Sequence, residues 1–271
     1  MNELDTQYSQ EEEPKLRHMR IGIMGAMGAG KSTLAIALGR RWGVNTIEEN
    51  FGENPFLVRF YENRKEYSFK SQTWFLEEKV KQLALLKFSG TEIIDPALEM
   101  DFIYAYTQYR LGWMSGEEFK MYETIYNTFK REKKIPFPDV FIVVDAPSGV
   151  LLQRIEKRIK EGGRDFERPI LTDPLYLEAL NLRLSEWVSV MTEKKFPVMM
   201  ISSDGNNFAE DEQSREITLG RIEGFIAIEL SKNPRTRTGE RLILPAFAPV
   251  QVRDVDITPG LSAQARRAYR G

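Results

Sequence analysis

A short glycine-rich stretch carries the clearest chemical signal in the chain. Gly25, Gly30, Lys31 and Ser32 fill the four fixed positions of the pattern G-x-x-x-x-G-K-[ST]. In such a loop the backbone N–H groups cradle phosphate oxygens, the lysine reaches the outer phosphates and the hydroxyl can hold Mg²⁺. We therefore predict that ATP or another nucleoside triphosphate binds with Mg²⁺ at Gly25, Ala26, Met27, Gly28, Ala29, Gly30, Lys31, Ser32 and Thr33.

Carboxylates are the groups best suited to acid–base chemistry in this chain. There is no cysteine and a single histidine, His18, which excludes disulfides, a Cys/His zinc site and a histidine-dependent nucleophile. Glu48 and Glu49 follow a predicted strand, at the end where ligands of open parallel sheets collect. Either glutamate could accept a proton from a hydroxyl that attacks the γ-phosphorus, and a solvated pair of acids is the other interpretation.

A second charged group follows the central part of the chain. A helix predicted over 150–160 places Arg154 and Arg158 one turn apart, and two glycines and Arg164 come after it. Arginines that close over a triphosphate spread charge away from the transferring phosphoryl group. We predict a lid that uses these three arginines, and the alternative is a solvated basic helix face.

An α/β sheet can bring these groups to one edge. Apolar stretches predict strands at 19–24, 44–47, 91–94, 140–145 and 196–201. Between them we expect an amphipathic helix at about 65–88, an aromatic helical segment at 102–134 with a break near Gly112, and a closing helix at 217–230. The predicted fold class is α/β: a P-loop NTPase-type three-layer fold whose five-stranded parallel sheet is flanked by helices, plus a helical lid.

Composition indicates one main domain with two different ends. The 271 residues are 42% hydrophobic and 29% charged, the net charge is −2, and no apolar run is long enough to span a bilayer. We expect a cytoplasmic protein without nucleic-acid or membrane partners. We predict a disordered acidic leader at 1–18, a P-loop domain at 19–230 and a basic, proline-containing arm or tail at 231–271.

The segment after the second predicted strand resembles the deoxyribonucleoside kinase family, which includes deoxycytidine, deoxyguanosine and deoxyadenosine kinases. The shared features are a strand-end glutamate, an N-P-[FY]-L segment, a Phe-Tyr pair and a glutamine eleven residues after that tyrosine. Here they match Glu49, the segment 54–57, Tyr61 with the preceding phenylalanine, and Gln72. The resemblance implies that Glu49 is the general base for the 5′-hydroxyl, that Tyr61 binds the sugar 3′-hydroxyl and that Gln72 hydrogen-bonds to the base.

The family pattern is altered at two places. Pro96 stands where the family carries an arginine, and Lys79 replaces another arginine, which pairs with an aspartate around the base. That aspartate matches Asp101, so we predict that Lys79 and Asp101 pair beside the base. The resemblance also implies that Glu167 touches a sugar hydroxyl.

Together these features predict a deoxynucleoside kinase that transfers the γ-phosphate of ATP or another triphosphate to the 5′-hydroxyl of a deoxyribonucleoside. The predicted catalytic residues are Lys31, Glu49, Arg154 and Arg158, and Mg²⁺ is expected on Ser32 and Glu49, partly through water. One alternative is a nucleoside monophosphate kinase, which needs a further basic site for the acceptor phosphate. Another is a catalytically inactive kinase-like subunit, which Pro96 favours. The resemblance implies a role in nucleotide salvage and a homodimer or higher homo-oligomer.

Overall fold

The structure of the chain is a computed structural model. It describes residues 19–86, 90–135, 137–206 and 208–232. The predicted leader at 1–18 lies outside the described residues, as does the predicted arm apart from its first two residues.

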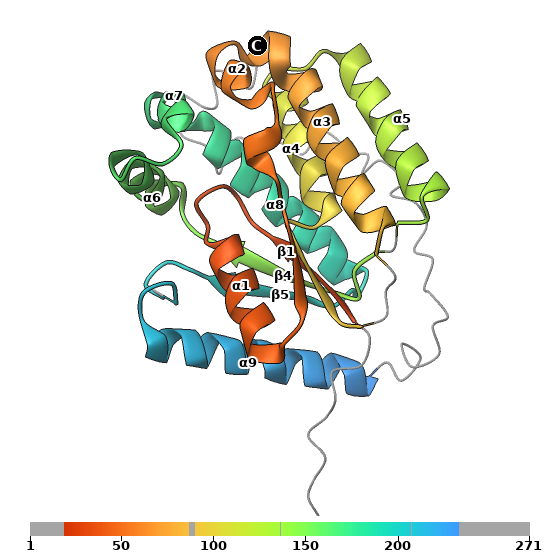
Figure 1. The fold of residues 1–271 in the computed structure, drawn as a ribbon, viewed down its shortest axis with the longest axis vertical. Helices are drawn as coiled ribbons and strands as arrows, with labels where there is room; N and C mark the ends of the chain where they lie inside the picture. The colour runs from red at the N-terminus through yellow and green to blue at the C-terminus, as the bar shows by residue number, and fades with distance from the viewer. Residues whose placement is uncertain (1–18, 87–89, 136, 207, 233–271) are drawn as a thin grey trace, which may run out of the picture.

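A five-stranded parallel sheet runs through the molecule in the order β2-β3-β1-β4-β5 (Figure 1). Its strands are β1 (Arg20–Met24), β2 (Asn45–Glu48), β3 (Glu92–Asp95), β4 (Val140–Asp145) and β5 (Val198–Ser202). All five predicted strands are present, and their ends differ from the predictions by no more than two residues. The central strands β1 and β4 are almost wholly buried, as expected from their continuous apolar sequences.

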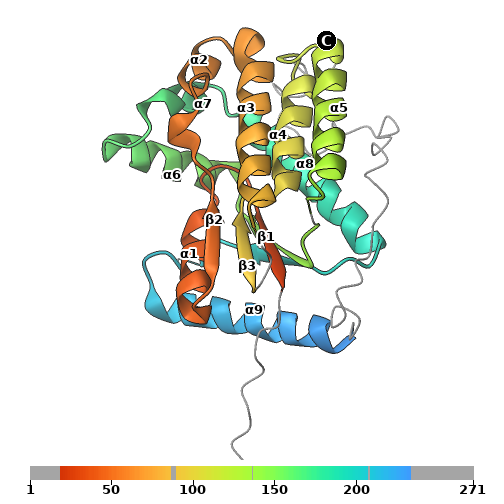
Figure 2. The ribbon, with the colours of Figure 1, turned by 45° about the vertical axis from the view of Figure 1, so that its right-hand side comes forward.

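Helices cover both faces of the sheet (Figures 1 and 2). They are α1 (Lys31–Trp42), α2 (Leu57–Glu62), α3 (Arg64–Ala84), α4 (Leu98–Arg110), α5 (Gly116–Glu132), α6 (Ser148–Lys160), α7 (Arg168–Thr172), α8 (Leu175–Glu193) and α9 (Glu212–Lys232), with short 3₁₀ helices η1 (Phe51–Glu53) and η2 (Asp165–Glu167). On one face α1 lies beside α9, and Arg41 of α1 forms ion pairs with Glu216 and Glu223 of α9 at 2.7 and 3.1 Å. Helices α3, α4, α5 and α8 form the layer on the other face. The predicted fold class is confirmed.

Two helix boundaries differ from the prediction. Helix α3 ends at Ala84 instead of near residue 88, because its apolar face ends at Leu83 and Leu85 is 82% exposed. Helix α9 begins five residues before the predicted start, and it runs to Lys232, two residues past the predicted end of the domain. Its first turn is polar and therefore has no apolar period to indicate a helix. Within the described residues no helix is long and apolar enough to cross a membrane.

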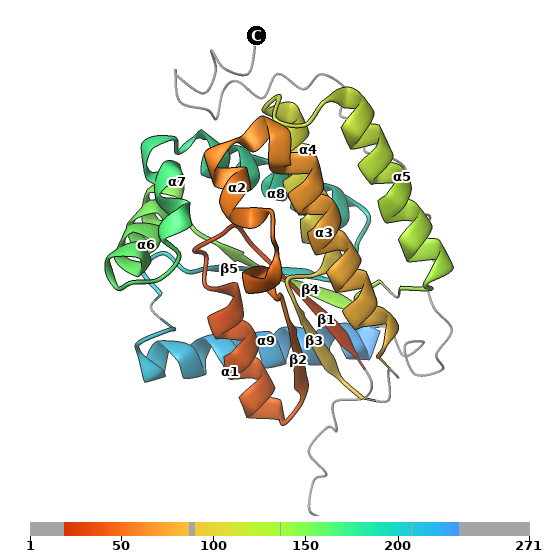
Figure 3. The same cartoon turned by 45° about the horizontal axis from the view of Figure 1, so that its top comes forward.

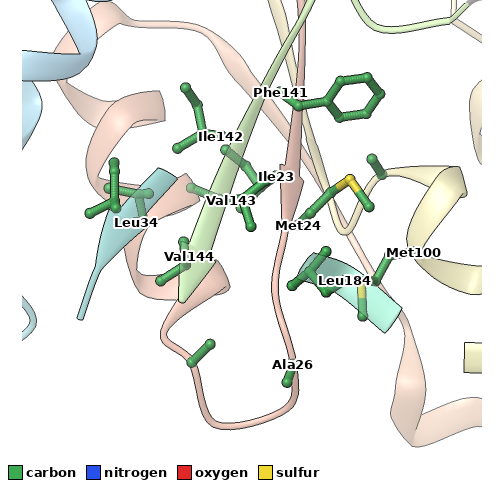
Figure 4. Close-up of a cluster of buried hydrophobic side chains, with 14 of the residues drawn as sticks. Ile23, Met24, Ala26, Leu34, Met100, Phe141, Ile142, Val143, Val144 and Leu184 are labelled. Atoms are coloured by element: carbon green, nitrogen blue, oxygen red, sulfur yellow. The ribbon is translucent and has the colours of Figure 1, made fainter. Parts of the chain in front are cut away.

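A buried apolar cluster supports the loop between β1 and α1 (Figure 4). Ile23 and Met24 of β1 pack with Val143 and Val144 of β4, and Leu34 of α1 is equally buried. Full burial of a side chain of this kind stabilises a fold by roughly 1.5–3 kcal/mol. The strand end from which the glycine-rich loop leaves is therefore held firmly.

Helices α3, α4 and α5 lie side by side on the opposite face (Figure 3), and a second buried cluster joins them. Leu76, Val80 and Leu83 recur along one side of α3 and pack against α4 and the buried rings of Tyr122 and Tyr126 in α5. This packing fixes the rotation of α3. As a result, Gln72 and Lys79 of the same helix are also buried.

Candidate active site

The glycine-rich loop has backbone conformations that require glycine. Gly25, Gly28 and Gly30 have φ values of 150°, 81° and 99°, and a Cβ on Gly25 would lie 2.5 Å from the carbonyl oxygen of Val144. The N–H of Leu34 donates to the carbonyl of Gly30 at 3.0 Å, which closes the first turn of α1. The loop thus meets a helix N-terminus at the carboxyl end of β1, the arrangement of a phosphate-binding site.

Lys31 is the cation of this loop. Its Nζ donates to the carbonyl of Ala26 at 3.1 Å. Burial lowers the pKa of Lys31, the nearby carboxylates of Asp95 and Glu49 oppose that effect, and two lid arginines lower the pKa further. The ammonium group therefore lies within electrostatic reach of both the strand-end carboxylates and the lid.

The two candidate bases differ in their surroundings. Glu48 is exposed, and its backbone carbonyl accepts a hydrogen bond from Nε2 of Gln82 at 3.3 Å. Glu49 is half-buried and lines a pocket beside the phosphate loop. Burial raises the pKa of Glu49, while the ammonium groups of Lys79 and Lys31 partly counteract the rise. The structure thus favours Glu49 as the carboxylate that faces a ligand.

The pocket brings together most of the predicted acceptor site. The space between its lining residues amounts to about 570 Å³, part of which is open to solvent. The predicted residues that line it are Glu49, Tyr61, Gln72, Asp101, Arg164 and Glu167. Lys79 is not among the described residues that line it.

The amide of Gln72 is suited to a polar ligand. Gln72 is only 5% exposed, and its side-chain oxygen Oε1 has no hydrogen-bond partner within the described part of the chain. A buried acceptor left unpaired costs about 1–3 kcal/mol, and a ligand N–H group would remove that cost. The neighbouring Ser71 hydroxyl accepts a hydrogen bond from Nδ2 of Asn54 at 3.1 Å, which fastens the segment 54–57 to α3.

Asp101 and Lys79 do not form the predicted ion pair. Burial raises the pKa of Asp101 well above its usual range, the charge of Glu49 adds to this, and Lys79 opposes it. Lys79 donates instead to the backbone carbonyl of Asp95 at 3.3 Å, and among the described residues no ion pair within 4.0 Å joins it to Asp101. The ammonium group of Lys79 therefore contacts the backbone carbonyl of Asp95 instead of the carboxylate of Asp101.

Tyr61 of α2 also lines the pocket. Its hydroxyl contacts the sulfur of Met27 at 3.8 Å, and its ring lies 5.5 Å from that of Phe166. Burial raises the pKa of Tyr61 well above its usual range, and the charge of Glu167 raises it further. The hydroxyl therefore stays protonated at neutral pH and is available as a hydrogen-bond donor.

Two lid arginines meet at Glu167, which is buried. Nε of Arg158 donates to one carboxylate oxygen of Glu167 at 3.1 Å, and its Nη2 donates to the same oxygen. The guanidinium of Arg164 lies 3.6 Å from the other oxygen and 3.6 Å above the ring of Phe51. The lid therefore reaches across to the segment that follows Glu49.

Arg154 joins the phosphate loop to the loop after β5. Its Nη1 donates to the carbonyls of Gly28 and Ala29 at 3.3 Å each and to the hydroxyl of Ser203 at 2.8 Å. Its Nη2 donates to the Ser203 carbonyl at 2.6 Å. The sequence predicted Arg154 as a lid arginine but gave no sign of this bridge, because its partner lies 49 residues away in the chain.

The donor groups at the strand ends are compatible with Mg²⁺ bound to a nucleotide. Ser32 is exposed on the first turn of α1, Glu49 lines the pocket, and a buried oxygen of Asp95 has no partner among the described residues. Within those residues no cluster of three or more His, Cys, Asp or Glu side chains could hold a metal alone. Mg²⁺ commonly uses one or two protein oxygens and takes its other ligands from phosphate and water, so this donor set fits the ion.

Position 96, directly after β3, carries no charged side chain. Pro96 and Ala97 are buried, and the N–H of Ala97 donates to the carbonyl of Ile23 at 2.9 Å. Arg164 on the lid and Lys79 beneath the strand end supply positive charge around Glu49 instead.

Several pocket residues were not identified as ligand contacts from the sequence. Tyr104, Tyr176 and Phe166 line the pocket, although no sequence motif had marked any of them as a ligand contact. Met27 was predicted only as part of the phosphate loop, but it also lines the pocket, where its sulfur contacts the hydroxyl of Tyr61. These residues come together only in the folded chain, because they lie on separate segments of the sequence.

The parallel sheet, the phosphate loop between β1 and α1, the arginine lid and the carboxylate after β2 together define a P-loop kinase, an enzyme that transfers phosphoryl groups. Comparison with known proteins narrows the class. A family model described as deoxynucleoside kinase matches residues 21–227. The chain belongs to the deoxynucleoside kinase family.

Similar proteins and structures agree with this assignment. The chain is 30% identical over 208 residues to a deoxyadenosine/deoxycytidine kinase of Bacillus subtilis, covering 76% of this chain and 92% of the relative. It is 32% identical over 187 residues to a deoxyguanosine kinase of the same organism, covering 69% and 86% of the two chains. A deoxyadenosine kinase from M. mycoides, solved with bound dATP, superposes with a TM-score of 0.63 at 27% identity, over 76% of this chain and all of the other.

Proposed function

We propose that this chain transfers the γ-phosphoryl group of a nucleoside triphosphate to the 5′-hydroxyl of a deoxynucleoside. The observation that carries the proposal is the pocket beside the phosphate loop. It combines an unpaired amide oxygen on Gln72 with a carboxylate, Glu49, at the end of a strand next to that loop. A side-chain amide can hydrogen-bond to the edge of a nucleobase, and a nearby carboxylate can accept the proton that the attacking hydroxyl loses.

The residues divide the reaction between them. Tyr61 and Glu167 hold the sugar, and Glu49 takes the proton as the 5′-oxygen forms its bond to the γ-phosphorus. The bond from that phosphorus to the β,γ-bridging oxygen breaks, and its electron pair stays on the departing diphosphate. Lys31 and the lid arginines Arg154, Arg158 and Arg164 stabilise the charge on the phosphates.

The charge of the pocket favours a nucleoside over a nucleoside monophosphate as acceptor. Among the described residues lining the pocket, Arg164 is the single cation, and the same lining holds the carboxyl groups of Glu49, Asp101 and Glu167. An acceptor phosphate would meet more negative than positive groups there. The retained Lys31 and Glu49 also argue against an inactive subunit.

The proposal includes Mg²⁺ as the counter-ion of the triphosphate, with Ser32 and Glu49 as its protein contacts, partly through water. When bound, the ion would neutralise phosphate charge as the bond to the leaving group breaks. We also propose a cytoplasmic role in nucleotide salvage and a homodimeric assembly, in keeping with the family resemblance.

The test is phosphorylation of each of the four common deoxynucleosides with Mg·ATP, followed by mass spectrometry of the 5′-monophosphates. Glu49→Gln should lower kcat by about 10²–10⁴-fold, the usual contribution of a general base. Its matched control is Glu48→Gln, an exposed neighbour that should leave kcat within about twofold, as is usual for a surface substitution. Phosphorylation of deoxynucleoside monophosphates without phosphorylation of nucleosides would refute the proposal.

A further inference from the structure

Lys79 differs from the other residues predicted to bind the acceptor. It lies seven residues after Gln72 on α3, which corresponds to about 10.5 Å along a helix axis at 1.5 Å per residue. It is only 2% exposed and is not one of the described residues that line the pocket. Its Nζ donates to the carbonyl of Asp95, the last residue of β3, at 3.3 Å. The ammonium group therefore contacts the sheet, whereas Gln72 faces the pocket.

A second side chain of α3 makes a parallel contact. Gln82, three residues after Lys79, donates from Nε2 to the carbonyl of Glu48 at 3.3 Å. Glu48 is the last residue of β2 and is paired in register with Asp95. The C-terminal half of α3 thus holds two adjacent strand ends through their carbonyls, and Glu49 follows one of these ends directly.

The charge of Lys79 also acts on the carboxylates at this edge. Among neighbouring charges, Lys79 has the largest effect in stabilising the ionised form of Glu49, ahead of Lys31, and it opposes protonation of Asp101. Asp95 and Arg164 face the same carboxylate of Glu49 from β3 and from the lid. A buried ammonium group in this position balances negative charge that would otherwise be costly to bury.

We infer that Lys79 is a positioning residue for phosphoryl transfer, which fixes the strand ends that carry Asp95 and Glu49, and that it does not read the nucleobase. The inference rests on the proposed kinase function. Base recognition then belongs to the part of α3 around Gln72, two turns earlier. A change at Lys79 should consequently slow transfer to every nucleoside by the same factor.

The test compares Lys79→Met and Lys79→Arg with wild type on all four deoxynucleosides. Lys79→Met should lower kcat by roughly 10–100-fold for each nucleoside, as expected when reacting groups are displaced by about 1 Å. The ratios of kcat/KM between nucleosides should stay within about threefold of wild type, because binding contacts to the base are intact. The matched control is Lys81→Met, an exposed lysine of the same helix paired with Glu77 and Glu78, which should behave as wild type.

A binding measurement keeps the test independent of catalysis and of one variant. Calorimetric titration of each nucleoside without triphosphate should give the same order of affinities for wild type and for Lys79→Arg. This variant keeps the buried positive charge, so it can be measured even if Lys79→Met does not fold. A change of tenfold or more in the relative affinities or in the kcat/KM ratios, with kcat for the best nucleoside retained, overturns the inference. If the wild-type protein phosphorylates no nucleoside, the proposed function is refuted as well. If the wild type is active but a Lys79 variant prefers the nucleosides in a different order, the inference alone is refuted.

Discussion

The bridge made by Arg154 gives the most quantitative prediction of the structure. Arg154→Met keeps the length of the side chain but removes all four of its hydrogen bonds to Gly28, Ala29 and Ser203. The two bonds to Ser203 are short and charge-assisted, a type that contributes about 1.5–3 kcal/mol each, while the two at 3.3 Å are weaker. Because the side chain is half-buried and such contributions do not add fully, we expect the free energy of unfolding to fall by about 2–3 kcal/mol in the absence of nucleotide.

Urea denaturation followed by tryptophan fluorescence measures this change. With a slope of about 2–3 kcal/mol/M, the unfolding midpoint should fall by about 1 M without a change in slope. The matched control is Lys157→Met on the exposed side of α6, whose solvent-exposed ion pair with Glu210 should contribute little to stability, so that its midpoint stays close to that of wild type. The KM for ATP should rise about tenfold or more in Arg154→Met if the arginine also contacts phosphate.

A double-mutant cycle with Ser203→Ala tests the bridge itself. The hydroxyl of Ser203 also donates to the carbonyl of Asp145 at 3.2 Å, so Ser203→Ala alone should be destabilising. If Arg154 and Ser203 are coupled, the double variant should differ from the sum of the single variants by about 0.5–3 kcal/mol. Strict additivity, or a midpoint for Arg154→Met equal to that of wild type, would refute the reasoning.

Three further substitutions test other parts of the site. Gly25→Ala places a Cβ 2.5 Å from the carbonyl oxygen of Val144 at a φ of 150°, so ATP binding in equilibrium dialysis should be lost, whereas Gly52→Ala, with nothing within 4 Å, should bind normally. Burial raises the pKa of Asp101 in the folded protein, so folding favours the protonated carboxyl group. The protonated group contributes fully to stability below the pKa of the unfolded chain, about 3.9, and this contribution is lost as pH rises through the raised pKa of the folded state. Asp101→Asn should therefore flatten the decline of thermal stability with rising pH, and an unchanged pH profile contradicts this. Gln72→Leu removes a buried unpaired acceptor and should raise the free energy of unfolding by about 1–3 kcal/mol while nucleoside affinity falls, and a variant that is less stable contradicts the idea that Gln72 is kept for a ligand.

Local sequence patterns were sufficient to predict most of the fold. The strand at Val140–Asp145 was predicted with its observed ends, because a continuous apolar run followed by an aspartate leaves little freedom in the assignment. Helix ends were less certain. The polar first turn of α9 has no apolar period, and the amphipathic helix predicted to about residue 88 ends at Ala84 in the structure.

The site could be predicted where its residues follow a short motif. The phosphate loop, Glu49 and Gln72 all lie in such segments, and the structure places each of them at one sheet edge. The contacts of Lys79 and Arg154 could not be predicted in this way. Both donate to backbone carbonyls, and a carbonyl is present at every residue, so the sequence does not mark which one is the partner.

The order of the strands has a consequence for how relatives diverge. The phosphate loop leaves β1 in the buried middle of the sheet, whereas Glu49 follows β2, an edge strand that is exposed at both ends. A substitution near β1 disturbs packing on both faces of the sheet. A substitution near β2 affects one neighbouring strand, β3, and few buried contacts. Over generations β2, the strand that leads to Glu49, can therefore accumulate changes that β1, the strand that leads to the phosphate loop, would not tolerate.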